Sequence, residues 1–368
     1  MHTTSLRRPV SSPKLVKVGI VGLDARARLF ADAAVRSDKL KIIAGFSRTA
    51  EKRRTFQGET RVPVVSDLKT LLSYPMLDGV ILTVPADQQL ALAAEIAKAK
   101  KHILIAGAVG STLQEAREIA ALELKYGVAV AAGHFACKLG GIARMREAIR
   151  KGELGTVALI EANFSKPSGV EGDEDSDGSE VSDSVLRAMA IEQYDILEYL
   201  GGEIVEVSAM ASGFDGPSEG LAGLTSLLKF ADGKLGYVGC SRSSPGLLAM
   251  RVFGSKGVMH FETDMGVWST PEKRQEASAL YLHRDGVGGK RENVMIPPTD
   301  TFAAQLKMFA EACRTGKSGE FSVTSAVNAL TVADAAARAL EKRGQSVRVE
   351  RVDDGGELRP RSSALLTT

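Results

Sequence analysis

Residues 17–28 read Lys-Val-Gly-Ile-Val-Gly-Leu-Asp-Ala-Arg-Ala-Arg, a short apolar run that ends in a glycine and passes directly into an amphipathic segment. In a dinucleotide-binding turn of the form G-x-G-x-x-G/A, the first glycine makes the tight turn. The second lets the backbone approach the pyrophosphate, and the third position lets the helix pack on the strand. Those positions hold Gly22, Asp24 and Ala27. The stretch therefore predicts the first strand and turn of a nucleotide-binding βαβ unit, with a carboxylate at the central position.

The carboxylate of Asp24 is the difficult feature of this turn. An anion beside a pyrophosphate lowers affinity unless a cation neutralises it, and Arg26 and Arg28 are the nearest candidates. We therefore include Leu23, Asp24 and Arg26 with Gly22 and Ala27 among the candidate cofactor-binding residues.

Composition narrows the class of protein. The chain has 368 residues, 44% of them hydrophobic, and a formal net charge of +2, which favours two domains and gives no sign of nucleic-acid binding. No segment predicts a membrane span. Three scattered cysteines indicate neither a disulfide framework nor a metal cluster, so no metal is expected and a cytoplasmic location is the plain interpretation. Residues 1–14 are expected to be a disordered tail, with a transit peptide as the weaker alternative.

Apolar runs alternate with helical patterns from residue 15 to residue 135. This alternation predicts a doubly wound parallel sheet, that is, a Rossmann dinucleotide-binding domain. The predicted strands are Val18–Gly22, Ile42–Phe46, Gly79–Val84, Ile103–Ile105 and Val128–Ala132.

Ligands bind at the carboxyl ends of such strands, so the residues that follow each run are informative. Ser47 and Arg48 follow the second strand, where an NAD-specific site would carry an acidic residue. A hydroxyl followed by an arginine suits the 2′-phosphate of NADP, although an ordinary strand-end cap with a solvated arginine is an equal alternative. The later candidates for the cofactor site are Thr83, Val84, Pro85 and Gln88 after the third strand, and Ala106 and Gly107 after the fourth.

His134 and Lys138 follow the fifth strand. A single histidine at a strand end is more often a packed or capping residue than a catalyst, but its place at the active edge of the sheet makes it a candidate.

A second domain is predicted over residues 136–350, with a large, mainly antiparallel open sheet. Ala231-Asp-Gly-Lys234 and Gly254-Ser-Lys-Gly257 predict hairpin turns. An acidic loop is expected over residues 170–183 and a polar tail over residues 351–368. The segment 184–200 has the apolar stripe of an amphipathic helix and carries Glu192 and Asp195 on one face. Two carboxylates on a helix are more often a solvated face than a catalytic pair.

The order of these segments resembles the Gfo/Idh/MocA family of NAD(P)-dependent oxidoreductases from about Lys17 to Val349. The resemblance rests on an ordered set of segments: Lys-Val-Gly-Ile-Val-Gly-Leu from Lys17, Asp-Gly-Val-Ile-Leu-Thr-Val-Pro from Asp78, Lys-His-Ile-Leu-Ile from Lys101, Gly133-His134, Gly-Glu-Leu-Gly from Gly152, and the helical ending from Ser325 to Gly344. It implies a Rossmann domain that binds NADP or NAD, a second α/β domain that binds a small-molecule substrate, and homodimers or homotetramers formed through the second sheet.

Two departures concern the chemistry. Members of the family typically carry Glu-Lys-Pro after the fourth strand, and here the triplet is Ala106-Gly107-Ala108. They also carry a D-x-G-x-H-x-x-D helix motif, and here Glu192 stands in place of the histidine and Asp195 keeps the final aspartate. The resemblance thus makes Glu192 the candidate general acid/base, with Lys138 or His134 as the source of positive charge and Asp195 as the retained member of the motif.

Three functions stay open from the sequence. The first is an NAD(P)-dependent oxidoreductase that acts on a sugar, a polyol or a related hydroxy or keto compound. The second is a catalytically degenerate relative that serves as a nucleotide- or ligand-binding regulatory subunit. The third is an NAD-assisted elimination or hydrolysis of a glycoside.

Overall fold

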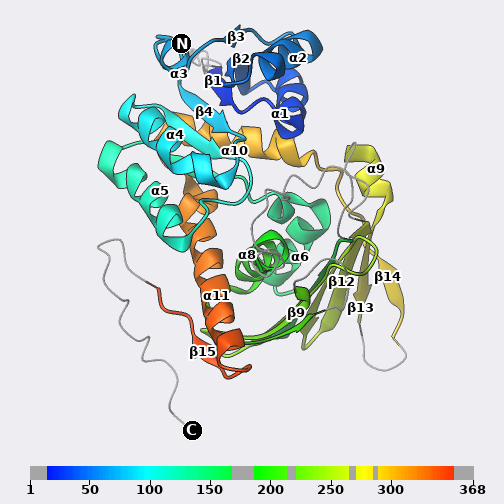
Figure 1. Cartoon of the computed structure of the whole chain (residues 1–368). Helices are drawn as coiled ribbons and strands as arrows, with labels where there is room; N and C mark the ends of the chain where they lie inside the picture. The colour runs from blue at the N-terminus through cyan, green and yellow to red at the C-terminus, as the bar shows by residue number, and fades with distance from the viewer. Residues whose placement is uncertain (1–14, 168–185, 214–220, 265–270, 285–288, 352–368) are drawn as a thin grey trace, which may run out of the picture. The chain divides into compact units, whose positions relative to one another are not determined.

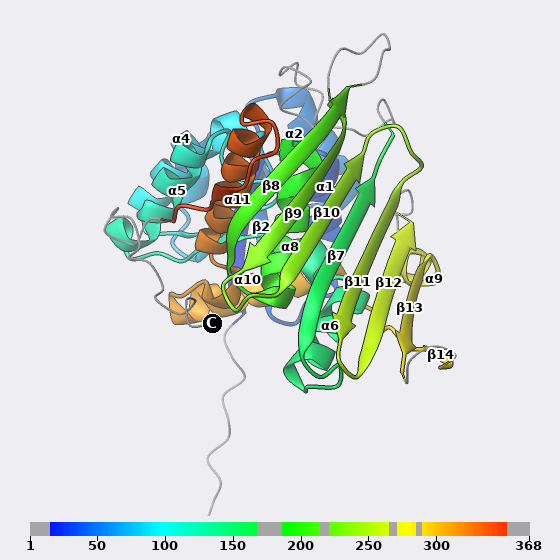
Figure 2. The same ribbon diagram turned by 90° about the horizontal axis from the view of Figure 1, so that it is seen from below.

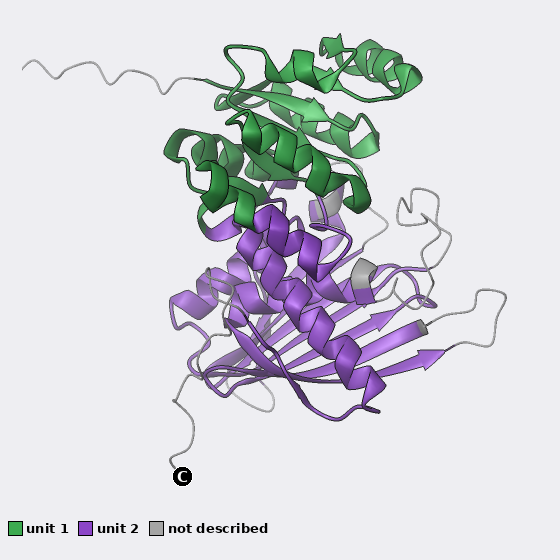
Figure 3. Ribbon diagram, turned by 60° about the vertical axis from the view of Figure 1, so that its left-hand side comes forward, with its two compact units in different colours: residues 1–106, 121–131, 302–319 green, residues 107–120, 132–301, 320–368 purple. Residues whose placement is uncertain are grey.

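A computed structural model describes residues 15–167, 186–213, 221–264, 271–284 and 289–351. The chain forms two compact units, coloured separately in Figure 3. Unit 1 comprises residues 1–106, 121–131 and 302–319, and unit 2 comprises residues 107–120, 132–301 and 320–368. The tail predicted over residues 1–14 and the acidic loop predicted over residues 170–183 lie outside the described residues, as does the C-terminal tail beyond Arg351.

The first sheet has six strands in the order β3-β2-β1-β4-β5-β6, which confirms the predicted doubly wound parallel sheet. Strands β1 to β4 are labelled in Figure 1. The strands are β1 (Val16–Val21), β2 (Leu40–Phe46), β3 (Val64–Val65), β4 (Gly79–Leu82), β5 (His102–Ile105) and β6 (Val130–Ala132). Only the two-residue strand β3 has no counterpart among the predicted runs. Because β1 lies between β2 and β4, the direction of winding reverses beside β1, and this is where ligands bind in such sheets.

The helices associated with this sheet follow its first five strands along the chain. They are α1 (Ala25–Val35), α2 (Ala50–Thr60), α3 (Leu68–Leu72), α4 (Ala86–Lys98) and α5 (Leu113–Tyr126), and α5 begins in unit 2 and ends in unit 1. Fully buried side chains of α1 and β1, among them Phe30 and Ile20, belong to one continuous hydrophobic core.

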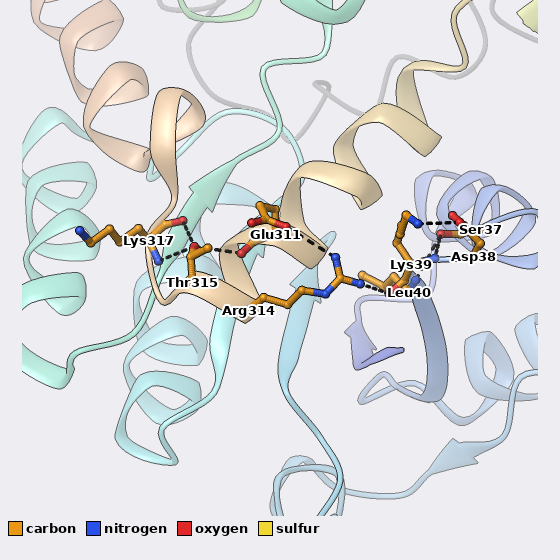
Figure 4. Close-up of polar contacts among 8 residues, drawn as sticks. All are labelled: Ser37, Asp38, Lys39, Leu40, Glu311, Arg314, Thr315 and Lys317. Carbon is orange, nitrogen blue, oxygen red and sulfur yellow. Dashed lines mark hydrogen bonds and ion pairs between the residues drawn. The ribbon is translucent and has the colours of Figure 1, made fainter. Parts of the chain in front are cut away.

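Helix α10 (Thr301–Thr315) belongs to unit 1, whereas the sequence boundaries assign it to the second domain. Phe309 is buried in the core of unit 1, and the ring of Phe302 packs edge-on against Phe30 with the ring centroids 5.0 Å apart. Arg314 donates to the carbonyl oxygen of Lys39, just before β2, over 3.3 Å (Figure 4). The apolar face of α10 therefore completes the first domain from a distant part of the chain.

Unit 2 is built on a nine-stranded sheet in the order β14-β13-β12-β11-β7-β10-β9-β8-β15, seen in Figure 2. Its strands are β7 (Val157–Ser165), β8 (Ile204–Gly213), β9 (Leu221–Phe230), β10 (Leu235–Ser241), β11 (Leu247–Gly254), β12 (Gly257–Asp264), β13 (Ser278–His283), β14 (Arg291–Asn293) and β15 (Val347–Arg348). Apart from the parallel pair β7–β10, the neighbouring strands are antiparallel, as predicted. Both predicted hairpin turns join antiparallel neighbours, β9 to β10 and β11 to β12.

Three helices cover one face of this sheet: α6 (Gly140–Arg150), α8 (Ile191–Gly201) and α11 (Val323–Glu341) (Figure 2). The described residues also form the short helical segments η1 (Ala136–Lys138), η2 (Leu186–Ala190), α9 (Pro271–Glu276) and η3 (Gly319–Phe321), of which η3 starts at the last residue of unit 1. Gly141 allows α6 to approach the sheet closely, because a Cβ there would lie 2.1 Å from the ring of Phe261. The hydroxyl groups of Tyr194 on α8 and Ser226 on β9 share a buried hydrogen bond of 2.7 Å.

The segment predicted as one helix over 184–200 begins in the described chain with a π-helical turn, η2, and continues as α8. Its predicted apolar stripe is confirmed, since Leu186, Met189, Ile196, Leu197 and Leu200 are all buried. None of the described helices is both long enough and apolar enough to cross a membrane.

Candidate active site

The ends of β1, β2 and β4 are joined by short hydrogen bonds around Gly22. The Gly22 amide donates to the carbonyl oxygen of Phe46 over 3.0 Å, and Oγ1 of Thr83 donates to the carbonyl oxygen of Gly22 over 2.6 Å. Gly22 has a φ of 89°, and a Cβ there would lie 2.8 Å from Oγ1 of Thr83. The turn after β1 therefore requires glycine at this position, as the dinucleotide-binding motif does.

Asp24 is the N-cap of α1. Its backbone is extended and its carboxylate accepts a hydrogen bond of 3.0 Å from the amide of Ala27. A carboxylate here satisfies a donor that the helix cannot satisfy itself and interacts favourably with the positive end of the helix dipole. Asp24 thus occupies part of the anion-binding end of α1, where a dinucleotide-binding fold places the pyrophosphate.

The two arginines that the sequence offers as partners of Asp24 have other contacts in the structure. Arg26 donates to the carbonyl oxygen of Ala106, at the end of β5, over 2.9 Å. Arg28 forms an ion pair of 3.4 Å with Glu59 on α2. Both guanidinium groups are thus engaged elsewhere in the described structure, and Arg26 connects α1 to another strand end of the same sheet.

Arg48 lies beyond the end of β2 and is exposed. Its guanidinium donates to the side-chain oxygen of Gln88 on α4 over 2.7 Å, while Arg53 donates to the carbonyl oxygen of Ser47. These contacts place Ser47, Arg48 and Gln88 together beside the end of β2. The position suits recognition of a ribose 2′-phosphate, for which a guanidinium is a good partner.

The other candidates for the cofactor site differ in exposure. Leu23, Ala27 and Ala106 are buried, Val84 is half-buried and Pro85 is exposed. Leu23 belongs to the hydrophobic core, so only its backbone is available to a ligand.

Gly107 has a φ of 119°, in a region that side-chain-bearing residues rarely adopt. The family that the sequence resembles has lysine at this place. Lysine would be strained in this conformation, so the backbone at residue 107 favours glycine.

The residues at these strand ends fit a dinucleotide in the turn at Gly22 and in the cluster of Ser47, Arg48 and Gln88. The carboxylate of Asp24 disfavours a bound pyrophosphate at this turn, because it carries a negative charge and occupies the amide of Ala27. Rotation of the Asp24 side chain would free that amide to bind the pyrophosphate.

The candidate catalytic residues all lie in unit 2, and two of them are in direct contact. Nδ1 of His134, just after β6, lies 2.5 Å from Oδ2 of Asp195 on α8. The side chains are only 5% and 14% exposed. Burial alone would lower the pKa of His134, but the charge and hydrogen bond of Asp195 outweigh it, so the pKa is raised.

Ser325, near the start of α11, holds the other nitrogen of this ring. Its hydroxyl lies 2.9 Å from Nε2 of His134 and donates to the carbonyl oxygen of Ser322 over 2.7 Å. Because the hydroxyl proton is used in that bond, Nε2 of His134 carries a proton and donates to Ser325. Both ring nitrogens are therefore engaged by the protein.

Cys137 also contacts this pair. Its thiol donates to Oδ2 of Asp195 over 3.4 Å, and the side chain is almost completely buried. Burial, together with the nearby charges of Asp195 and Glu192, raises the pKa of the thiol well above its usual value.

Lys138 is the last residue of η1, and its ammonium lies 2.9 Å from the centre of the Phe321 ring. Burial lowers the pKa of Lys138 to about 8. Lys138, which the sequence indicates as a candidate source of positive charge, therefore lies over the face of the Phe321 ring.

Glu192 lies in the first turn of α8 and is half-buried. The charge of its carboxylate contributes to the raised pKa of the Cys137 thiol, so Glu192 lies near Cys137.

A cavity of about 290 Å³ in unit 2 opens onto this cluster. His134, Cys137, Asp195 and Ser325 form part of its wall. The other charged residues of the wall are Arg146, Glu198, Glu203, Glu320 and Arg351. Arg146 pairs with Glu320, and Arg351 pairs with both Glu198 and Glu203.

Two members of the cluster, Cys137 and Ser325, are absent from the candidates derived from the sequence. The spacing His134-x-x-Cys137 is a signal that would have found the cysteine. Ser325 is 191 residues from His134 in the chain, and no local pattern connects them.

Two family models match the chain. The oxidoreductase family with an NAD-binding Rossmann fold matches residues 16–134, and the GFO/IDH/MocA C-terminal domain matches residues 142–260.

Relatives of similar length support the same assignment. The uncharacterized oxidoreductase YrbE of Bacillus subtilis is 24% identical over 89% of this chain and 95% of its own. The myo-inositol 2-dehydrogenase of Thermotoga maritima is 23% identical over 92% of this chain and 99% of its own.

Solved structures share the fold over almost the whole chain. A protein from Desulfitobacterium hafniense, provisionally named an NADPH-dependent oxidoreductase, superposes with a TM-score of 0.85 and 27% identity over 91% of this chain and 98% of its own. Levoglucosan dehydrogenase in complex with NADH superposes with a TM-score of 0.77 and 16% identity over 92% of this chain and 100% of its own. The two family matches, which together cover more than half of the chain, show that it belongs to the Gfo/Idh/MocA family of oxidoreductases, with an N-terminal NAD-binding Rossmann domain.

Proposed function

We propose that the chain is an NAD(P)-dependent oxidoreductase that acts on the CH–OH group of a sugar, a polyol or a related hydroxy or keto compound. The observation that carries this proposal is the match of both domains to the family, together with a full-length relative named myo-inositol 2-dehydrogenase. The nicotinamide would supply the acceptor or donor of hydride, and the protein must supply binding, orientation and a group that takes the hydroxyl proton.

We assign the adenosine end of the cofactor to Ser47, Arg48 and Gln88, and we propose a preference for NADP over NAD. The support is the exposed guanidinium of Arg48, which already lies beside Gln88 at the end of β2. The relative from Desulfitobacterium hafniense, provisionally named for NADPH, is consistent with this preference.

We assign proton transfer to Glu192, in place of the histidine of the family. His134 is a poor proton acceptor here, because both of its ring nitrogens are already hydrogen-bonded within the protein. The half-buried carboxylate of Glu192 takes the proton, while Asp195 orients His134 and the cations His134 and Lys138 provide positive charge.

Binding followed by turnover tests the proposal. The purified chain is titrated with NADPH and NADH by calorimetry, and reduction of NADP and NAD is then followed with a panel of inositols, aldoses and anhydrosugars. Micromolar binding and turnover of at least one polyol are expected. Failure of both nucleotides to bind below millimolar concentration would overturn the proposal.

A regulatory binding subunit is the second candidate. It is favoured by the carboxylate of Asp24 on the pyrophosphate end of α1 and by the glycine that replaces the family lysine at residue 107. Nucleotide binding without turnover of any substrate in the panel would support this alternative.

We propose a homodimer or homotetramer formed through the open face of the nine-stranded sheet. Alternation along β8 to β11 places Met210, Leu227, Leu235 and Leu247 away from the helices, and these apolar side chains are 42% to 72% exposed. Light scattering of wild type and Leu227→Lys tests this surface, because a charge at the centre of an apolar interface should dissociate the oligomer.

The three cysteines are free thiols, and two of them are buried. We propose a cytoplasmic location from the low cysteine content, and free thiols are compatible with it.

A further inference from the structure

Three metal-binding side chains converge in unit 2. The ligand atoms Nδ1 of His134, Sγ of Cys137 and Oδ2 of Asp195 all lie within 4.8 Å of one another. We propose that this cluster is a binding site for Zn²⁺. The inference goes beyond the proposed function and depends on the geometry of unit 2 alone.

The donor set suits zinc. Thiolate, imidazole and carboxylate are its three usual protein ligands, at about 2.0–2.3 Å, whereas magnesium and calcium prefer oxygen ligands alone. Tetrahedral ligands at these bond lengths lie about 3.5 Å apart. The contact between Cys137 and Asp195 is already 3.4 Å, and the 2.5 Å contact between His134 and Asp195 has to open by about 1 Å when the proton between them is replaced by the metal.

Nε2 of His134 has a fixed hydrogen-bond partner, as the second nitrogen of a metal-bound histidine commonly does. A metal on Nδ1 requires a neutral ring with its proton on Nε2, and such a proton is commonly held by a fixed acceptor. Ser325 accepts it over 2.9 Å and is itself fixed by the carbonyl oxygen of Ser322. The protein therefore orients the ring with Nδ1 toward Cys137 and Asp195.

Asp195 differs from the other acids on the wall of the cavity. Glu198, Glu203 and Glu320 are paired with arginines, which cannot give up their proton. The partner of Asp195 is His134, and a histidine, unlike an arginine, can give up its proton. A divalent ion can therefore replace a proton at Asp195 without leaving an uncompensated charge.

The exchange preserves charge and leaves room for a fourth ligand. Binding of one Zn²⁺ releases two protons, one from the thiol of Cys137 and one from Nδ1 of His134. The buried cluster of protonated histidine, carboxylate and thiol is neutral, and so is the cluster of metal, neutral histidine, carboxylate and thiolate. The adjacent cavity of about 290 Å³ offers the fourth position to water or to an oxygen atom of a ligand.

Cobalt spectroscopy of the full chain tests the site. The purified protein is freed of metal with a chelator and titrated with Co²⁺ without oxygen, nucleotide or substrate. We expect a thiolate-to-cobalt charge-transfer band and strong visible bands of a four-coordinate ion, both saturating at about one equivalent and both lost when Zn²⁺ is added. Zn²⁺ should also raise the melting temperature of the wild type by several degrees.

Matched variants identify the ligands. Cys137→Ser should abolish the charge-transfer band, and His134→Gln should weaken cobalt binding by at least tenfold. Cys240→Ser and Cys313→Ser, which change the other two thiols, should keep the band. Circular dichroism shows which variants are folded, and the wild-type titration decides the matter if one is not.

A wild type that shows no thiolate band with millimolar Co²⁺ overturns the inference, as does a band that survives Cys137→Ser. Binding at surface histidines alone gives no thiolate band and counts against the site. Because nucleotide and substrate are absent, these outcomes are independent of the proposed oxidoreductase activity.

Discussion

Nδ1 of His134 and Oδ2 of Asp195 lie 2.5 Å apart, although the two residues are 61 positions apart in the chain. The first residue follows a strand of the parallel sheet, and the second belongs to the helix that carries the retained end of the family's motif. The pair, with Ser325 on the other ring nitrogen of His134, joins the segment of unit 2 that carries His134 to α8 and α11.

Asp195→Asn should destabilise the chain by about 2–3 kcal/mol, because it leaves a buried histidine without its counter-ion. Urea unfolding with a chelator present measures the free energy of unfolding. The matched control is Asp232→Asn in the exposed hairpin, whose side chain is 61% exposed and pairs with Lys234. It should change stability by no more than about 0.5 kcal/mol. Equal effects of the two changes would contradict the structural role of the pair.

Asp24→Gly should tighten binding of NADPH and NADH together, because it removes an anion from the start of α1. Stability should fall by only a few tenths of a kcal/mol, since glycine is tolerated at an N-cap. Asp24→Asn keeps the acceptor for the Ala27 amide and removes only the charge. Calorimetry of both variants separates the charge from the cap, and unchanged affinity in both would show that Asp24 lies apart from the bound nucleotide.

Arg48→Ala should weaken NADPH binding about tenfold and NADH binding much less, because only NADPH has a 2′-phosphate to pair with the guanidinium. Arg54→Ala, an exposed arginine on α2, is the control and should affect neither. Equal losses of affinity for NADPH and NADH in Arg48→Ala would show that Arg48 does not recognise the 2′-phosphate.

Glu192→Gln should lower kcat by about a hundredfold or more with little change in KM, because the amide keeps the shape of the side chain but cannot accept a proton. Glu147→Gln on α6, where the carboxylate is exposed and pairs with Lys151, should keep wild-type turnover. Steady-state kinetics of the two variants with a substrate from the panel measures these effects. Undiminished turnover in Glu192→Gln would show that Glu192 does not accept the proton.

His102 should make stability depend on pH. Burial lowers the pKa of His102, and its Nδ1 accepts a hydrogen bond of 2.9 Å from the amide of Ala129. Because the folded-state pKa lies below the unfolded value of about 6.5, this contribution is complete above that pH. It is lost as the pH falls through the lowered folded-state value.

His102→Asn keeps a side-chain acceptor but does not titrate. Urea unfolding at about pH 7.5 and about pH 5 should show a larger loss of stability for the wild type than for this variant. The same loss in both would place the titrating group elsewhere.

The sequence by itself determined the architecture. The glycine turn after the first apolar run and the alternation of strands and helices up to residue 135 predicted the parallel sheet, because period and turn chemistry are local properties. The hairpin turns at 231–234 and 254–257 predicted antiparallel neighbours in the second sheet for the same reason. The cofactor candidates could be named because the ends of parallel strands meet at one edge.

Tertiary structure decided what local patterns do not encode. The assignment of α10 to unit 1 depends on the packing of Phe302 and Phe309 against residues far away in the chain. The role of Asp24 as a helix cap and the route of Arg26 to the carbonyl oxygen of Ala106 are set by geometry after folding.

The same is true of the cluster in unit 2. His134 and Cys137 are local neighbours, but Asp195 and Ser325 reach them only because α8 and α11 pack, within unit 2, against the segment that carries His134 and Cys137. Sequence patterns report periodicity within one element, whereas a site made of three elements depends on the close packing between them, which only the folded chain specifies.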